Sequence, residues 1–306
     1  MTKEEVKEYI DNYISHIISM TEYGNWFADE IKSLVENSKE ECDKVLYSHH
    51  YATTKKVCND CKREIDVILK YLEEEITSLI EKEVMKLSEE EKEWLEEYIA
   101  GPLGLSFSYS DKASKLLLLI PIASAGIVGQ YGNTLAERLR TIYNQEIISS
   151  YVSGVPFDEL DYETRFNTFY RGLEADSETL GESLATQYDR IIYTANDKKI
   201  NKYMWLAILD GRTCLVCADL DHTVYSKIED VPIYAKHNRC RCSVMIINDE
   251  IEKFVPESYE QWFENQSPKE KYQILGKKRF ELYESGMKIK NFVNNGKITP
   301  LKDLKK

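Results

Sequence analysis

The chain contains little proline or glycine, and it has no hydrophobic run long enough to cross a membrane. Seven prolines and 13 glycines among 306 residues are too few for a collagen-like or low-complexity chain. The most apolar stretch, Leu116 to Val128, is interrupted by Pro121 and falls short of the roughly 20 residues that span a bilayer. We therefore expect no membrane partner and predict a buried helix that starts or kinks at Pro121.

A secretory signal is also missing. The amino terminus reads MTKEEVKEYI, without an apolar run or a small-residue cleavage site, so the cytoplasm is the expected compartment. The chain has seven cysteines, an odd number, clustered in CxxC and CxC spacings. In a reducing compartment this pattern favours metal binding over a framework of disulfides.

The chain has fewer basic than acidic residues, and the two kinds are unevenly distributed along it. Lysine and arginine number 40 against 53 acidic residues, a net charge of -13, which argues against sequence-wide affinity for nucleic acid. Acidic residues predominate up to Glu97, whereas the segment after Ile251 is rich in lysine. The two ends suggest different partners, although a solvated helical face explains each bias at least as well.

What remains is the composition of a folded, helix-rich protein with ample material for a core, 42% hydrophobic and 30% charged. Apolar residues recur at three-four spacing, which predicts helices over 4–45 with a break at Gly24, over 64–87, over 135–152 and over 177–200. Ser88 followed by Glu91 predicts a capping box that starts another helix. The segment 101–111 is the clearest break, and the loop VPFDELD is expected to cap a helix near Tyr162.

The pattern changes at Tyr203. Short apolar and β-branched runs, MWLAIL, HTVYSKI and CSVMIIN, predict a small sheet around the cysteines, with a turn at Asp210-Gly211. Ser267-Pro268 then opens one of several short helices. The expected fold is α+β, mainly α: a long helical N-terminal region, a small β element built around a Cys/His cluster, and short C-terminal helices. We divide it into an acidic helical arm or bundle (1–100), a helical region (101–200) and a C-terminal domain (201–306).

Five residues are candidate metal ligands. Cys214 and Cys217 form a CxxC knuckle, and His237 with Cys240 supplies a second pair at a spacing typical of structural zinc sites. Cys242 is a fifth candidate that could replace either Cys240 or His237. Four protein ligands leave no open position for water, so the pattern predicts a structural zinc ion rather than a hydrolytic one. The alternatives are reduced thiols packed as small hydrophobes, or a redox pair.

Other residues near the cysteines have plainer roles. Cys58 and Cys61 lack a second well-spaced ligand pair, which favours thiols on a helix surface. Arg212 and Arg241 flank the cluster, and we expect them to pair with Asp210 or Asp219 rather than to contact phosphates.

The ordered motifs LDGRTCLVCADLDHTVY, HNRCRCSVMII, EQWFENQ and KYQILGKKRFELYESG carry a family resemblance. Over about residues 178–304 the chain resembles the C-terminal domain of phage Mu F-like head morphogenesis proteins, the minor head (minor capsid) proteins of tailed bacteriophages. The residues that stand where the family pattern places them are Asp210, Arg212, Thr213, Cys214, Cys217, His237, Cys240, Arg241 and Cys242, followed by Leu275, Gly276, Arg279 and Gly286.

The resemblance implies a structural, non-enzymatic protein that binds the portal and assists procapsid assembly and DNA packaging or delivery. It implies location in the virion, inside the capsid near the portal, and in the host cytoplasm during assembly. The implied partners are the portal protein and other capsid or scaffold proteins, with DNA as a further partner of the basic C-terminal tail. His222 departs from the family's usual glycine and becomes a spare candidate ligand. Residues 1–101 match no family motif, and their acidic helices suit docking onto another protein.

Two other classes of function remain open at this stage. One is a metal-dependent nuclease with His222 or His237 as the base, against which the sequence has no second carboxylate-histidine cluster for a catalytic ion. The other is a zinc-knuckle nucleic-acid-binding protein, which the basic tail permits and the acidic balance disfavours.

Overall fold

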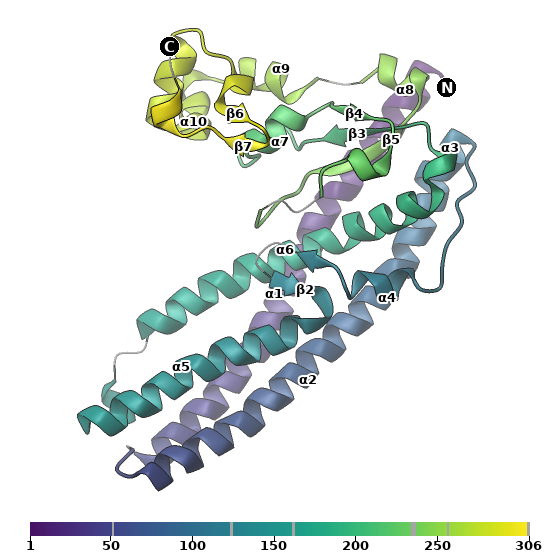
Figure 1. The fold of residues 1–306 in the computed structure, drawn as a ribbon. Coiled ribbons are helices and arrows are strands. Elements are labelled where there is room, and N and C mark those ends of the chain that lie inside the picture. The colour runs from purple at the N-terminus through teal and green to yellow at the C-terminus, as the bar shows by residue number, and fades with distance from the viewer. Residues whose placement is uncertain (51, 123–124, 161–162, 234–236, 256, 305–306) are drawn as a thin grey trace.

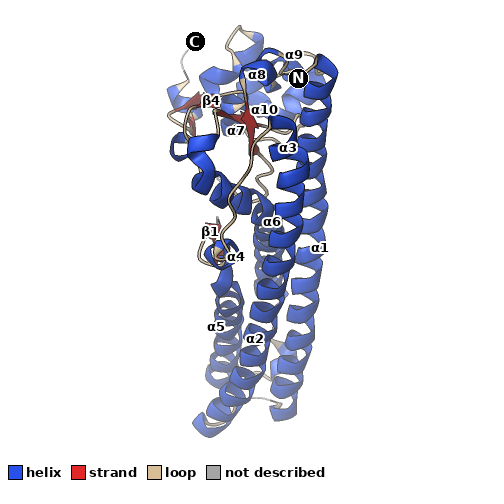
Figure 2. Cartoon of the chain, turned by 90° about the vertical axis from the view of Figure 1, so that its right-hand side faces the viewer, coloured by secondary structure: helices blue, strands red, loops and turns tan. Residues whose placement is uncertain are grey.

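The computed structural model describes residues 1–50, 52–122, 125–160, 163–233, 237–255 and 257–304. The fold is α+β and mainly α, with 72% of the residues helical, as the sequence predicts. Four long helices run side by side, and a small sheet with the short C-terminal helices lies at one end of them (Figures 1 and 2). The long helices are α1 (Lys3–His49), α2 (Lys55–Trp94), α5 (Tyr131–Ser153) and α6 (Glu163–Asn196). No helix in these ranges is both long and apolar enough to cross a membrane.

The sheet has three antiparallel strands in the order β4 (Val224–Tyr225), β3 (Lys202–Leu206) and β5 (Ser243–Ile247). The shorter helices are α3 (Gly101–Leu103), α4 (Ala113–Leu117), α7 (Leu215–Leu220), α8 (Asp249–Lys253), α9 (Tyr259–Glu264) and α10 (Pro268–Glu284). Two small hairpins pair β1 (Pro121–Ile122) with β2 (Gly126–Ile127) and β6 (Val293–Asn294) with β7 (Lys297–Ile298). A π-helical turn (Leu95–Ala100) follows α2, and 3-10 turns cover Val128–Gln130, Phe157–Glu159, Asp197–Lys199, Ile228–Asp230, Ile289–Phe292 and Leu301–Asp303.

Helix α1 does not break at Gly24, so that prediction is wrong. A Cβ built on Gly24 would lie 2.5 Å from Cγ of Glu182 and 2.8 Å from the backbone oxygen of Glu178, both on α6. The glycine therefore serves close packing between α1 and α6 within a continuous helix, and the cost of glycine in a helix interior is offset by that contact.

The predicted helix start at Ser88 is also wrong, because α2 continues through it. The Ser88 hydroxyl donates a hydrogen bond to the Val84 carbonyl oxygen, 2.6 Å away, one turn earlier in the same helix. Glu91, the expected partner in a capping box, is instead buried and contacts His16 of α1. A serine whose hydroxyl donates to the preceding turn can lie inside a helix. The capping pattern alone therefore does not show that a helix begins at Ser88.

The apolar segment around Pro121 is a hairpin and not a buried helix. Helix α4 ends at Leu117, and β1 pairs with β2 through Pro121 opposite Ile127. Proline has no backbone N–H and disfavours helical backbone in the residue before it, which explains the extended conformation here. Residues 123 and 124 of this segment lie outside the described ranges.

The predicted helices 135–152 and 177–200 are confirmed, with small differences in their bounds. Helix α5 covers the predicted 135–152, and α6 covers 177–196 of the predicted 177–200. The helix expected near Tyr162 is α6, which begins at Glu163, and Tyr162 itself lies outside the described residues. Ser267 and Pro268 open α10 with a capping box, and this helix kinks at Gly276, where φ is 68°.

The start of α1 packs against the sheet. The hydroxyl of Tyr9 donates to the Ile246 carbonyl oxygen at 2.8 Å, and that of Tyr13 donates to the Val244 carbonyl oxygen at 2.6 Å. One continuous core includes buried residues from Val6 to Ile251, so the bundle and the sheet share it. A second, smaller core joins α7, α9 and α10 through Leu215, Tyr259, Phe263, Leu275, Ile289, Phe292 and Val293. The cysteine cluster lies where these two cores meet.

Candidate metal centre

The structure brings all five predicted ligands together. Cys214, Cys217 and His237 place their ligand atoms within 4.8 Å of one another, and so do Cys217, Cys240 and Cys242. Cys217 belongs to both groups and is almost fully buried, at 1% exposure. The cluster can therefore hold a metal ion among ligands that are far apart in the sequence.

The separations between the ligand atoms are close to those of a tetrahedral metal site. His237 Nε2 lies 3.1 Å from Cys214 Sγ and 4.0 Å from Cys217 Sγ, and Cys217 Sγ lies 3.8 Å from Cys240 Sγ. Ligands 2.0–2.3 Å from a central zinc ion would be separated by about 3.3–3.8 Å along the edges of a tetrahedron. The three measured separations lie in or close to that range, so the cluster could hold a metal ion, and both Cys240 and Cys242 remain candidates for the last position.

A helix start and a strand start position the cysteines. Cys214 is the N-cap of α7, and its Sγ accepts a hydrogen bond from the Cys217 N–H at 3.4 Å. The CxxC spacing places Cys217 on the first turn of this helix, where it points back toward Cys214. Cys242 directly precedes β5, whose register against β3 is fixed by five residue pairs from Lys202–Ile247 to Leu206–Ser243.

Protons and negative charge are concentrated in the cluster. A hydrogen bond with Cys217, aided by His237, lowers the pKa of Cys214 to about 4, although burial opposes the shift. The hydrogen bond with Cys214 raises the pKa of His237 to about 11. Hydrogen bonds with Cys214, Cys240 and Cys242 raise the pKa of Cys217, whereas those with Cys217 and Cys242 lower the pKa of Cys240. Thiolates and protons therefore share one site, and a divalent cation would replace those protons on binding.

The loop that carries His237 and Cys240 is fastened to helix α6. Asn238 Nδ2 donates to Asp176 Oδ1 at 3.1 Å, and the Arg239 N–H donates to Thr179 Oγ1 at 2.7 Å. Arg239 also pairs with Glu178. Asp176 and Thr179 of α6 are buried and Glu178 is half-buried. Helix α6 therefore offers the loop hydrogen-bonding partners rather than an apolar face.

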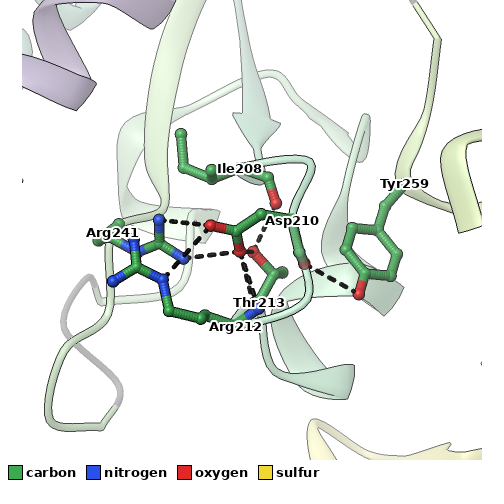
Figure 3. Close-up of polar contacts among 6 residues, drawn as sticks. All are labelled: Ile208, Asp210, Arg212, Thr213, Arg241 and Tyr259. Atoms are coloured by element: carbon green, nitrogen blue, oxygen red, sulfur yellow. Dashed lines mark hydrogen bonds and ion pairs between the residues drawn. The ribbon is translucent and has the colours of Figure 1, made fainter. Parts of the chain in front are cut away.

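Asp210 organises the turn before the cysteines (Figure 3). Its Oδ1 accepts hydrogen bonds from the backbone N–H groups of Arg212 at 2.9 Å and Thr213 at 3.1 Å, as expected of a turn residue. Both carboxylate oxygens also accept from Arg241, each at 2.8 Å. Arg212 lies farther away, with Nε 3.6 Å from Oδ2. Burial raises the pKa of Asp210, but the bonds from Arg241 outweigh it and leave the pKa lowered. The predicted pairing of both arginines with Asp210 is confirmed.

Asp221 is a structural residue of the site that the sequence did not single out. Its buried carboxylate accepts from the backbone N–H groups of Ala207 at 2.8 Å and Tyr259 at 2.7 Å. It thereby connects the end of β3 to the start of α9. The Tyr259 hydroxyl donates in turn to the Asp210 carbonyl oxygen at 3.4 Å (Figure 3). The C-terminal helices are thus attached directly to the turn that presents Cys214.

His222 and the first three cysteines stand apart from the centre. His222 has a φ of 60°, which fits a position where glycine is usual, and its Nε2 lies 3.7 Å from Asp221. Within the described ranges, neither His222 nor Cys42, Cys58 or Cys61 belongs to a group that could hold a metal ion. Cys58 is half-buried, but Cys61 is fully buried and so is not the surface thiol that the sequence suggested.

The fold and site together define a class: a mainly helical α+β protein whose bundle and C-terminal helices meet at a Cys/His centre able to hold a metal ion. Comparisons of this chain with family models, with curated proteins and with solved structures gave no match. Any more specific function must therefore be argued from the residues.

Proposed function

We propose that this chain is a minor head protein of a tailed phage, similar to the Mu F-like head morphogenesis proteins. The observation that supports this most directly is that the ordered motifs form one connected unit. Asp210 of the first motif pairs with Arg241 of the second, and Asp221 binds the backbone of Tyr259 just before the third. Motifs that are separated in the sequence and linked in space are expected of a shared structural design.

The metal in this proposal is a structural zinc ion. Three of the five candidate ligands, Cys217, Cys240 and Cys242, are at most 5% exposed, as suits an ion enclosed by protein. Such a site stabilises the fold in which it forms, because the unfolded chain lacks the preformed ligand geometry. Here the ion would hold the loop that carries His237 and Cys240, the strand β5 and the helix α7 in fixed positions relative to one another. The proposal assigns the protein no enzymatic activity.

The partners we propose are the portal protein and other capsid or scaffold proteins. The chain would act in the host cytoplasm during procapsid assembly and remain inside the capsid near the portal, assisting DNA packaging or delivery. The four-helix bundle extends away from the end of the molecule that holds the metal centre, and its length offers room for protein contacts (Figure 1). The net charge of the whole chain, -13, favours partners with basic surfaces.

Co-expression with the portal protein of the phage that would encode this chain tests the proposal. We expect the two to co-purify and to elute together at a mass that corresponds to a few copies of this chain per portal ring. Separate elution of the intact, metal-loaded chain and the portal at micromolar concentrations would contradict the proposal.

DNA contact through the C-terminal segment is a second candidate activity. Lys269, Lys277 and Lys278 on α10 are exposed and are available for phosphates. Binding of this kind weakens steeply as salt rises, because it releases counterions from the DNA. Charge reversal of these three lysines should abolish binding of the full chain to duplex DNA at low salt if the segment makes the contact. Unchanged binding by that variant would exclude it.

A further inference from the structure

A groove of about 450 Å³ lies between α1 and α2 on the side of the bundle. These two helices run side by side along the molecule (Figure 2). The residues that form the groove are Glu30 and Leu34 of α1 and Tyr71, Glu74, Glu75 and Leu79 of α2. Both of its walls are therefore helices, and it follows their length.

The floor of the groove is apolar. Leu34 and Leu79 are half-buried and pack against the core of the bundle, and Tyr71 beside them is 64% exposed. Exposed apolar side chains continue along both helices, because Val67 lies one turn before Tyr71, and Trp26 lies eight residues before Leu34. Residues four apart lie on one side of a helix, so the strip on α2 from Val67 to Leu79 is about 18 Å long.

The rim of the groove is acidic. Glu30, Glu74 and Glu75 are exposed, and no lysine or arginine is among the described residues that line the groove. Glu74 forms an exposed ion pair with Lys70 at 3.9 Å, which contributes little energy. Within the part of the chain that the structure describes, Glu30 and Glu75 have no salt-bridge partner. Their carboxylates are therefore open to cations of a partner, which the net charge of -13 also attracts.

This combination favours a helix with one apolar and one basic side. A small molecule is usually enclosed by its site, whereas Tyr71 and the acids here are exposed. A peptide strand binds to the edge of a sheet, which two helices do not offer. An amphipathic helix, in contrast, places apolar side chains three, four and seven residues apart into a groove of this kind. Basic side chains that flank its apolar side would then lie against Glu30 and Glu75.

We propose that the groove between α1 and α2 binds a basic amphipathic helix of a partner protein. Leu34, Tyr71 and Leu79 contact the apolar side of that helix, and Glu30 and Glu75 pair with its lysines or arginines. The inference goes beyond the proposed function, because it does not depend on which protein carries the helix. Binding of the portal and binding of a basic helix can therefore fail separately.

Fluorescence anisotropy of labelled synthetic peptides with the full, zinc-loaded chain tests the proposal. The probe has about 18 residues, roughly 27 Å as a helix, with leucines at three-four spacing and lysines elsewhere. One control peptide has the same composition in an order that leaves no helical face apolar, and another has glutamate in place of lysine. We expect saturable binding of one probe per chain, at least about tenfold tighter than binding of either control.

A substitution in the floor of the groove tests the apolar contact. Tyr71→Ala should weaken binding of the probe about tenfold, since aromatic side chains near the centre of an interface contribute most to affinity. Tyr151→Ala removes an exposed tyrosine from α5 and should leave the affinity unchanged. Circular dichroism of each variant establishes that its helices are folded.

Charge reversal at the rim tests the ionic contact. Glu30→Lys combined with Glu75→Lys should weaken binding of the lysine probe at least about tenfold and should allow the glutamate peptide to bind. Glu81→Lys combined with Glu163→Lys makes the same change in net charge at exposed positions outside the groove. Because salt screens distant charges, this control should weaken binding of the probe by less than about threefold in 0.15 M salt.

Three results would overturn the proposal. They are absence of saturable binding by the amphipathic lysine peptide, equal affinity for the peptide of shuffled order, or unchanged affinity in the folded groove variants. A fourth is self-association of the chain that the groove variants abolish, without binding of the peptide, which would assign the groove to a second copy of the chain.

Discussion

Gly24 and Gly181 face each other where α1 meets α6. A Cβ built on Gly181 would lie 2.8 Å from Cα of Gly24 and 3.1 Å from Cβ of Phe27. Contacts this short with backbone and Cβ atoms cannot be relieved by rotating a flexible side chain. The approach of the two helices at this point, which also places Glu182 beside α1, therefore depends on glycine at both positions.

Substitution of Gly181 by alanine should destabilise the protein by about 1–3 kcal/mol, because the added methyl group overpacks the α1–α6 contact. The matched control is Gly172→Ala in the same helix, where a Cβ would meet nothing within 4 Å. That change should instead stabilise the protein by about 0.5–1 kcal/mol, since alanine is the better helix former. Urea denaturation followed by circular dichroism measures both. Equal effects of the two substitutions would show that the helices do not depend on this contact.

Asp210→Asn should cost about 1–3 kcal/mol of unfolding free energy. Asparagine retains the side-chain oxygen that accepts from the backbone of the turn, but it leaves the Arg241 guanidinium, whose side chain is 9% exposed, without its anionic partner. The exposed Asp219, the other partner that the sequence allowed, provides the control, and Asp219→Asn should change stability by no more than about 0.5 kcal/mol. If the two variants unfold at the same denaturant concentration, the ion pair does not stabilise the turn.

A buried acid pair should make stability depend on pH. Glu91 and Asp189 are each 2% exposed, and burial raises the pKa of Glu91 to about 8 and that of Asp189 above its usual value. His16, 2.8 Å from Glu91, has its pKa lowered from 6.5 by burial, so its own contribution makes stability rise with pH and levels off above pH 6.5.

For an acid with a raised pKa, the folded state holds the proton more tightly than the unfolded state, so stability falls as pH rises toward the folded pKa. Between pH 6.5 and 8, each of the two acid protons should account for a loss of about 1–2 kcal/mol. Glu91→Gln should flatten this slope, whereas Glu90→Gln, at the exposed neighbouring position, should leave it unchanged. Denaturation curves across this range provide the measurement, and parallel slopes for Glu91→Gln and the unmodified chain would refute the account.

Cys214→Ser should release the metal and loosen the C-terminal part while the four-helix bundle stays folded, because α7, α9 and α10 have a core of their own, separate from the core that the bundle shares with the sheet. Limited proteolysis should then cut within about residues 207–304, and Cys58→Ser, outside the centre, should leave the digestion pattern as it was. Protease resistance of the C-terminal part that survives Cys214→Ser would contradict this prediction.

The last ligand can be assigned with two further variants. Five candidate residues surround a site that needs four, so one of Cys240→Ser and Cys242→Ser should retain the metal with nearly full affinity while the other loses it. Competition with a zinc chelator of known affinity would distinguish them. Equal loss in both variants would mean that both thiols bind and that one of the other three residues does not.

Sequence periodicity predicted most of the helices, and cysteine spacing predicted which residues gather in the Cys/His cluster that could hold a metal ion, because both signals are local. The errors arose where a distant partner decides the local structure. Gly24 signals a break unless Gly181 packs against it, and Ser88 signals a helix start unless its hydroxyl bonds back to Val84. Asp221 could not be chosen from among many acids, since what distinguishes it is the burial of its carboxylate beside the centre.

The central claim is that the cysteines and His237 form a zinc site that holds the bundle, the sheet and the C-terminal helices together. Elemental analysis of protein purified without chelator, paired with native mass spectrometry, tests it most directly. The account predicts one zinc ion per chain, with the cluster thiols protected from modification until the metal is removed. Metal-free protein that keeps its fold and whose cluster thiols, those of Cys214, Cys217, Cys240 and Cys242, titrate as free thiols would contradict it.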